Sequence, residues 1–247
     1  MGETAPGALG GRTWPSAGRP VLLVPVGSLE QHGPHLPLDT DTVIAVAVAE
    51  DLAERMRAAG DDAVVAPAIA IGASGEHQGF AGTLSIGSAA LETVVLELCR
   101  SATLWLDRIV FVNGHGGNVA ALSAAVPLAR SEARDAAWLP CAPAGPVPAG
   151  DAHAGFVETA IMLHLHPGRV RNDLVEPGAT APLAELMPAM RAGGVVAVSP
   201  NGILGDPTGA TAADGERLLR GMCDRAWALL RDGVVGSGGR LVAVSAD

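Results

Sequence analysis

Short apolar runs alternate along this chain with longer segments whose apolar residues recur at helical spacing, and no other feature constrains the fold as strongly. A short continuous apolar run is typical of a strand buried on both faces, whereas helical spacing is typical of a helix that packs on a sheet. The expected strands are 21–26, 63–71, 108–112 and 136–141. The expected helices are 42–59, 88–107, 119–132, 156–165, 182–192 and 212–231. This order predicts an α/β fold, a three-layer α/β/α sandwich with a mostly parallel sheet.

The chain shows no internal repeat and no linker of the kind that separates domains, so we expect a single domain over 1–247 with a loose lead-in over 1–19. The lead-in lacks the cationic start and apolar core of a signal peptide, and no apolar run approaches the roughly 20 residues that span a bilayer. Cys99, Cys141 and Cys223 lie far apart and are odd in number, which favours buried free thiols. We therefore expect a cytoplasmic protein that does not enter a membrane.

Charge and composition bear on the class of partner. The formal net charge is −10, and no run of basic residues offsets it. An acidic surface repels phosphate backbones. The chain also has no Tyr and few Phe or Trp residues on which bases could stack. Both features argue against nucleic acid as a partner.

The first loop that leaves an expected strand is rich in metal-binding side chains. In parallel sheets, ligands bind beyond the carboxyl ends of the strands. Glu30 and His32 are two residues apart, so they point to the same side of an extended segment, and Asp41 opens the helix that follows. Carboxylates and imidazoles suit divalent cations such as Zn²⁺ and Fe²⁺. The alternative is that Asp41 only caps its helix and that Glu30 is a solvated loop charge.

A second loop, 113–118, follows the expected strand 108–112 and places His115 beside glycines. Glycine allows a tight turn and a close approach to a ligand, so His115 is a candidate metal ligand. The alternative is a phosphate-binding loop at the start of the next helix. No Walker lysine follows the loop, and its glycine spacing is not that of a dinucleotide fingerprint.

Two further segments carry candidate catalytic or binding residues. His153 precedes the expected helix 156–165, where an imidazole can act as a general acid or base. Glu158, in the first turn, is either a further metal ligand or a carboxylate that stabilises the helix start. Glu76 and His77 either contact substrate or belong to an ordinary surface loop. We expect the remaining histidines to be structural: His35, His164 and His166.

Segments 27–37, 113–118 and 153–159 together resemble the signature blocks of the creatininase family of metal-dependent amidohydrolases. The resemblance implies two divalent cations, with Fe²⁺, Zn²⁺ and Mn²⁺ as the candidate metals. It implies that Glu30 and His115 bind one cation and that His32 binds the other. It implies that Asp41 bridges the two cations. It also implies that His153 is a catalytic histidine, which protonates the departing amine or steadies the tetrahedral oxyanion.

Segments 72–80 and 198–211 are most similar to a peptidase of this family. That peptidase removes the modified C-terminal Val-Tyr dipeptide from a ribosomally made precursor peptide. The resemblance therefore implies a modified precursor peptide as the substrate, and we expect it to contact Glu76, His77, Gly116 and Asp151. Members of the family tend to assemble from several copies, so a homo-oligomer is also expected.

The chain departs from the family pattern at Gly117, where creatininase itself has an acidic metal ligand. The second cation then needs another ligand, for which Glu158 is the candidate. Ala81 and Ala160 replace a Pro and a Ser of the family blocks. Two other functions stay open: hydrolysis of a small cyclic amide or formamide, and a non-catalytic metal-binding scaffold. His153 argues against the scaffold, because a storage site needs no additional histidine.

Overall fold

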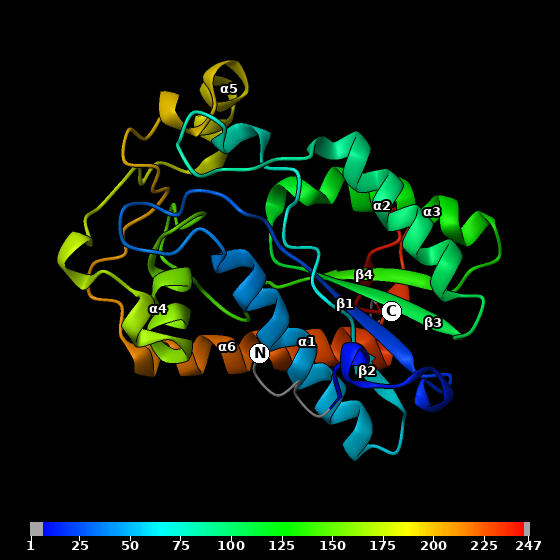
Figure 1. The fold of residues 1–247 in the computed structure, drawn as a ribbon. Helices are drawn as coiled ribbons and strands as arrows, with labels where there is room; N and C mark the ends of the chain where they lie inside the picture. Colours follow the sequence, from blue (N-terminus) through cyan, green and yellow to red (C-terminus); the bar gives the residue numbers. More distant parts are fainter. Residues whose placement is uncertain (1–6, 245–247) are drawn as a thin grey trace.

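Four parallel strands form the central sheet of the protein, whose computed structural model describes residues 7–244 (Figure 1). The strands are β1 (Val21–Val26), β2 (Ala63–Val65), β3 (Arg108–Asn113) and β4 (Ala136–Pro140), in the order β2-β1-β3-β4. Every neighbouring pair is parallel. The predicted α/β fold with a parallel sheet is confirmed.

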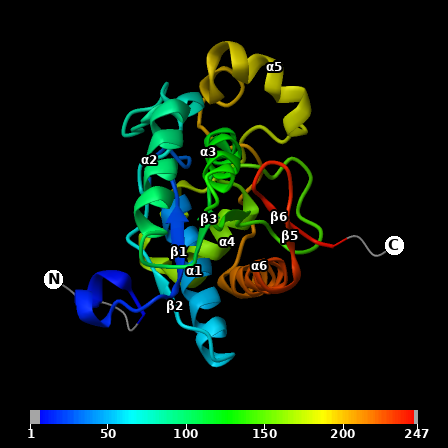
Figure 2. The ribbon, with the colours of Figure 1, turned by 90° about the vertical axis from the view of Figure 1, so that its right-hand side faces the viewer.

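Helices cover both faces of this sheet. They are α1 (Thr40–Ala58), α2 (Gly87–Ala102), α3 (Val119–Ser131), α4 (Phe156–Leu165), α5 (Leu183–Gly193) and α6 (Ala212–Asp232). Figures 1 and 2 show α1 and α6 on one face, α2 and α3 on the other, and α5 standing apart from these layers. The arrangement is the predicted three-layer sandwich.

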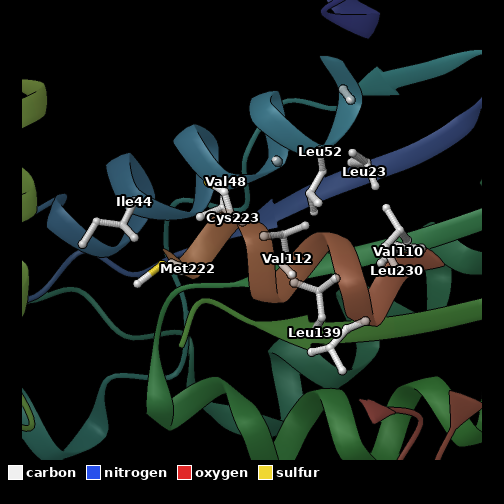
Figure 3. Close-up of a cluster of buried hydrophobic side chains, with 14 of the residues drawn as sticks. Leu23, Ile44, Val48, Leu52, Val110, Val112, Leu139, Met222, Cys223 and Leu230 are labelled. Atoms are coloured by element: carbon white, nitrogen blue, oxygen red, sulfur yellow. The ribbon is translucent and has the colours of Figure 1, made fainter. Parts of the chain in front are cut away.

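Alternate strand residues build two separate cores. Leu23, Val110 and Leu139 pack against α1 and α6 in one core, which Figure 3 shows. Phe111 and Trp138 point to the opposite face and pack against α2 and α3. Each large apolar side chain buried in this way contributes about 1.5–3 kcal/mol relative to its exposed state. Because both faces of the sheet are covered, its strands are apolar throughout, which is why they were recognisable in the sequence.

The structure corrects several sequence-based expectations. The strand expected over 63–71 ends at Val65, and only Ile69 regains a bridge, to Val26; Pro67, which has no N–H, interrupts the run. The helix expected over 88–107 ends at Ala102. A short hairpin of β5 (Val234–Val235) and β6 (Leu241–Val242) was not predicted, since two-residue strands carry no periodicity.

The described part of the expected lead-in, residues 7–19, is attached to the body rather than loose. The Val65 N–H donates to the Gly7 carbonyl at 3.0 Å, and Arg12 forms an ion pair with Asp62 at 2.8 Å. Residues 1–6 of the lead-in lie outside the described residues. Across residues 7–244, no helix combines the length and the apolar character that crossing a membrane requires.

Candidate active site

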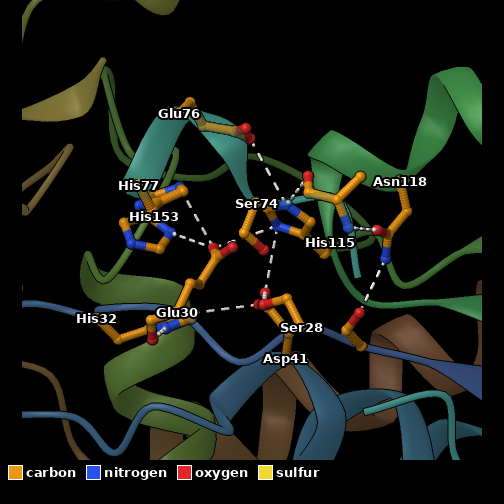
Figure 4. A network of polar contacts seen from close by, with 12 residues as sticks. Ser28, Glu30, His32, Asp41, Ser74, Glu76, His77, His115, Asn118 and His153 are labelled. Carbon is orange, nitrogen blue, oxygen red and sulfur yellow. Dashed lines mark hydrogen bonds and ion pairs between the residues drawn. The ribbon is translucent and has the colours of Figure 1, made fainter. Parts of the chain in front are cut away.

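The two central strands deliver the candidate residues to one edge of the sheet. β1 and β3 pair in parallel up to Val26 opposite Asn113, so the loops that begin at Gly27 and Gly114 leave the sheet side by side. Glu30 and His32 come from the first loop and His115 from the second (Figure 4). A cavity of about 690 Å³ opens over this edge. The structure therefore brings the residues that the sequence singled out to one edge of the sheet.

Glu30 lies at the centre of the cluster. Its side chain is fully buried, and neither carboxylate oxygen has a hydrogen-bond partner among the described residues. Three imidazole nitrogens face Glu30 Oε1, namely His115 Nδ1 at 3.2 Å, His77 Nε2 at 3.3 Å and His153 Nδ1 at 3.6 Å. A buried carboxylate without hydrogen bonds is unfavourable unless a cation compensates it. Glu30 is thus not the solvated loop charge of the alternative interpretation.

Asp41 presents its two oxygens to two different histidines. His32 Nε2 lies 3.2 Å from Oδ1, and His115 Nδ1 lies 3.2 Å from Oδ2. The Ser28 hydroxyl donates to Oδ2 at 2.6 Å. Asp41 lies inside α1, whose N-cap residue is Asp39, so it does not cap the helix. A carboxylate placed between two histidines in this way has the geometry needed to bridge two cations.

Three groups of side chains have ligand atoms close enough together to hold a metal ion. All ligand atoms within a group lie within 4.8 Å of one another. The groups are Glu30 with Asp41 and His115, His32 with His153 and Glu158, and Glu30 with His77 and His153. Neighbouring groups share residues or lie in contact, so the arrangement offers more than one adjacent cation position.

Glu158 has contacts that fit both interpretations that the sequence left open. Its Oε2 atom accepts the Ala154 N–H at 2.6 Å, just before the start of α4, and lies 3.8 Å from His32 Nε2. Burial raises the pKa of Glu158 to about 7, against the opposing effect of His32. The carboxylate therefore stabilises the helix start and also belongs to the cluster.

His115 is oriented by the backbone behind it. Its Nε2 atom lies 3.2 Å from the Ala73 carbonyl, which can only accept, so this nitrogen carries the proton. The Nδ1 atom then faces Glu30 and Asp41, where a cation would take the place of its proton. The Asn113 amide donates to the His115 carbonyl at 2.7 Å and holds the loop in place.

Gln31 is the residue that the sequence analysis missed. Its amide oxygen accepts the Gly33 N–H at 2.9 Å, and its amide nitrogen donates to the Gly202 carbonyl at 3.0 Å, which fixes the amide orientation. The same nitrogen lies 2.9 Å from His77 Nδ1. The Gln31 carbonyl accepts from His153 Nε2 at 2.8 Å. The only sequence signal was its place between Glu30 and His32.

These contacts assign the ring tautomers of two histidines. His153 carries its proton on Nε2, so its Nδ1 lone pair faces the site. His77 accepts at Nδ1 and therefore carries its proton on Nε2, which points at Glu30. One buried residue thus orients both rings: the side-chain amide of Gln31 holds His77, and its backbone carbonyl holds His153.

The electrostatics of the cluster are those of a site built for cations. Burial lowers the pKa of His32, but Asp41 and the other carboxylates outweigh it and raise the pKa to about 10. Burial likewise raises the pKa of Asp41, yet His32 and His115 hold it well below its usual value. Burial lowers the pKa of His77 to about 3. Without metal, protons on His32 and His115 balance the carboxylates, and cations would displace those protons.

The remaining predicted residues differ in their surroundings. Glu76 lies on the short helix η3 (Gly75–His77), with Oε1 3.5 Å from His115 Nε2, and it lines the cavity with His77 and Gly116. Asp151 also lines the cavity, but its carboxylate accepts the Phe156 N–H at 2.5 Å and the Val157 N–H at 3.1 Å. Its visible role is to hold the start of α4.

Gly117 has no room for the acidic side chain that creatininase carries there. A Cβ atom at Gly117 would lie 2.4 Å from His115 Nε2 and 2.7 Å from Glu76 Oε1. Outside the cluster, His35 bonds Thr159 Oγ1 at 2.8 Å, and His164 and His166 are exposed. Their structural assignment agrees with these positions.

Comparison with known proteins supports this picture. The family model described as creatinine amidohydrolase matches residues 12–230. The mycofactocin precursor peptide peptidase of Mycolicibacterium smegmatis is 64% identical over 204 residues, which are 82% of this chain and 81% of that protein. The protein of the same name from Mycobacterium tuberculosis is 56% identical over 83% of this chain and 82% of its own.

More distant matches have the same fold. The creatinine amidohydrolase of Pseudomonas putida is 32% identical over 70% of this chain and 75% of that protein. A solved structure titled as creatininase with Mn superposes with a TM-score of 0.76 at 28% identity, covering 91% of this chain and 97% of the other. A mutant creatininase of Zn-Zn type gives 0.75 at 28% identity, over 90% and 96% of the two chains. The chain belongs to the creatininase family.

Proposed function

We propose that this chain is a metal-dependent peptidase that cleaves the mycofactocin precursor peptide. The relatives with the highest identities here carry that name, and they match most of the chain. The observation that carries the chemistry is the buried Glu30 carboxylate, which has no hydrogen-bond partner within residues 7–244 and faces three histidines. This arrangement supports a hydrolase that uses cations rather than a Ser or Cys nucleophile.

The donor set fits a pair of divalent cations. Glu30, Asp41 and His115 would hold one cation; His32, Asp41 and Glu158 would hold the other, with Asp41 shared. Mixed imidazole and carboxylate donors suit Fe²⁺, Zn²⁺ and Mn²⁺. Bound cations supply Lewis-acid polarisation of the amide carbonyl and lower the pKa of a water from 15.7 to about 7. Glu158 takes the place of the acid that Gly117 cannot provide.

The protein's own groups then handle the protons. The free Nδ1 lone pair of His153 faces the site, so it can accept a proton from the attacking water and pass it to the departing amine nitrogen. His77 presents its Nε2–H toward Glu30 at 3.3 Å. We extend the proposal to release of the modified C-terminal Val-Tyr dipeptide and to a homo-oligomeric assembly.

Mass spectrometry of the modified precursor peptide tests the proposal directly. The purified protein, loaded separately with Fe²⁺, Zn²⁺ or Mn²⁺, should shorten the peptide by its C-terminal dipeptide, and a chelator should stop the reaction. Creatinine and a formamide serve as comparison substrates. Preferential turnover of creatinine or the formamide would support the small-amide alternative. Metal binding without hydrolysis of any of these substrates would support a non-catalytic metal-binding scaffold.

Two substitutions connect the metal to the activity. Asp41→Ala or His115→Ala should reduce both the bound metal and the rate to background. Metal content by mass spectrometry and chain integrity by circular dichroism provide the controls. A metal-free variant with full activity would refute the mechanism.

A further inference from the structure

The helix α5 forms one wall of the active-site cavity. Its cavity-lining residues recur at helical spacing and therefore share one face: Leu183, Met187, Met190 and Arg191. No residue of α5 is buried, although its apolar side chains point toward the site. Figure 1 shows α5 as a separate helix beyond the sheet layers. The face is thus an apolar wall with a positive charge at one end.

The position of this wall is fixed relative to the metal-binding cluster. Gly194, directly after α5, has φ +73, and a Cβ atom there would lie 2.8 Å from the Glu76 carbonyl oxygen. Gly79 likewise contacts Val196, with its Cβ position 3.0 Å from Val196 Cγ1. The C-terminal end of α5 therefore lies against η3, which carries Glu76 and His77. A ligand that fills the cavity would therefore contact both this face and the cluster.

Arg191 differs from every other arginine in the described chain. The sequence has 16 basic residues, all of them arginine. Fifteen of them form a hydrogen bond, an ion pair or a contact with the Trp138 ring. For Arg191, residues 7–244 provide no such partner. It is exposed, and no other arginine lines the cavity.

The acids that line the same cavity are engaged elsewhere. Asp41 contacts His32 and His115, Asp151 accepts two backbone N–H groups, and Glu158 accepts another. Glu76 lies closest to His115. In a chain of net charge −10, a cation that lines the site and has no partner among residues 7–244 favours an anion that arrives with the ligand.

We propose that Arg191 binds a carboxylate of the substrate peptide, while Leu183, Met187 and Met190 contact apolar side chains next to it. The inference rests on the proposed peptidase function and adds a specificity residue to it. A planar guanidinium matches a carboxylate through two parallel hydrogen bonds. The carboxylate is either an Asp or Glu side chain of the peptide or its C-terminal α-carboxylate, and the experiment separates these sources.

The test begins with steady-state kinetics of Arg191→Gln on the modified precursor peptide. Loss of a charge-assisted pair should raise KM by about 10-fold to 100-fold with little change in kcat. Arg220→Gln is the matched control, because Arg220 is also exposed on a helix but pairs with Glu216 and lies outside the cavity lining. Metal content should stay at the wild-type level in both variants. An unchanged KM for Arg191→Gln would overturn the inference.

Altered peptides identify the carboxylate. One peptide carries a C-terminal amide, and others replace each Asp or Glu singly by Asn or Gln. The peptide that lacks the relevant carboxylate should bind the wild-type protein more weakly than the unaltered peptide does. The Arg191→Gln protein should bind these two peptides equally well. Placing Lys at that position should restore binding to Arg191→Glu. Additive losses for every peptide would overturn the inference.

A binding measurement separates this inference from the proposed function. Calorimetric titration of the peptide into Asp41→Ala protein requires no cleavage. If the wild-type protein binds the peptide without cleaving it, the proposed peptidase function is wrong. Weaker binding to the Arg191→Gln, Asp41→Ala double variant than to Asp41→Ala would still support the role of Arg191. Equal binding to the single and the double variant would contradict that role.

Discussion

At the scale of single residues, the site depends on side chains that orient other side chains. Gln31 and the Ala73 carbonyl fix the ring tautomers of three histidines, so that each ring turns a defined nitrogen toward Glu30. These histidines are His77, His115 and His153. Partners of this kind fix the tautomer and the ring plane of a metal-binding or catalytic histidine. Removing such an orienting partner should therefore weaken metal binding as well as slow catalysis.

Gln31→Ala tests this positioning role. We expect metal affinity to fall about 10-fold to 100-fold, because His77 loses the side-chain amide that orients it, whereas His153 keeps its bond to the backbone carbonyl of residue 31. Competition with a chromophoric chelator measures the affinity. Gln78→Ala, an exposed glutamine beside the same short helix, should behave like wild type. Unchanged metal affinity in Gln31→Ala would show that the His77 ring is held by other contacts.

Two adjacent glycines allow a sharper comparison. Gly117→Ala would place its Cβ atom 2.3 Å from the Ala73 carbonyl and 2.4 Å from His115 Nε2, so His115 must move. A Cβ atom at Gly116 would meet nothing within 4 Å. We expect Gly117→Ala to lose metal and about 1–3 kcal/mol of stability by overpacking, and Gly116→Ala to lose neither. Metal analysis and urea unfolding check both; equal behaviour of the two variants would refute the steric account.

At the scale of elements, the sequence predicted the helices and strands that have a regular apolar pattern and clear signals at their ends. The segment 156–165 was placed without error, because its apolar positions and the following Pro167 mark both ends. The end of β2 and the hairpin of β5 and β6 were not predictable, since they depend on tertiary pairing of very short segments. Gln31 was missed for a related reason: its partners His77, His153 and Gly202 come from distant parts of the chain.

Asp151 illustrates how an element-level role can replace a predicted substrate contact. Its carboxylate bonds two N–H groups at the start of α4, the helix that carries Glu158. Asp151→Ala should therefore cost about 1–2 kcal/mol of unfolding free energy in metal-free protein, as loss of a helix cap does. Urea unfolding of Asp151→Ala and of the exposed control Asp173→Ala measures the difference. Normal stability together with a raised KM would instead support the substrate contact.

At the scale of the whole molecule, buried histidines make stability depend on pH. Burial, with a contribution from His32, lowers the pKa of His35 from 6.5 to about 4. Between these values the unfolded chain binds a proton that the folded chain does not, so the folded state loses stability as pH falls from 6.5 toward 4. The stability that depends on a neutral His35 is fully present above pH 6.5. Between pH 6.5 and 4, about 3 kcal/mol of the free energy of unfolding is lost.

Urea unfolding of chelator-treated protein at several pH values measures this dependence. His35→Gln removes the titrating group, so its unfolding free energy should vary less with pH over the same window. Ser237→Ala, at an exposed position far from His35 in sequence, should keep the wild-type slope. An equal slope in His35→Gln and wild type would show that other groups produce the acid sensitivity.

The parallel pairing of β1 and β3 has a consequence for how the protein can vary. Removing one residue from either strand would shift the loop beyond it by about 3.3 Å and turn the next side chain to the opposite face. That displacement is as large as the whole distance from Glu30 Oε1 to His115 Nδ1, which is 3.2 Å, so the cluster would come apart. Homologues should therefore keep the lengths of these two strands unchanged. Insertions and deletions that adapt the protein to other substrates should fall around α5, where no side chain is buried.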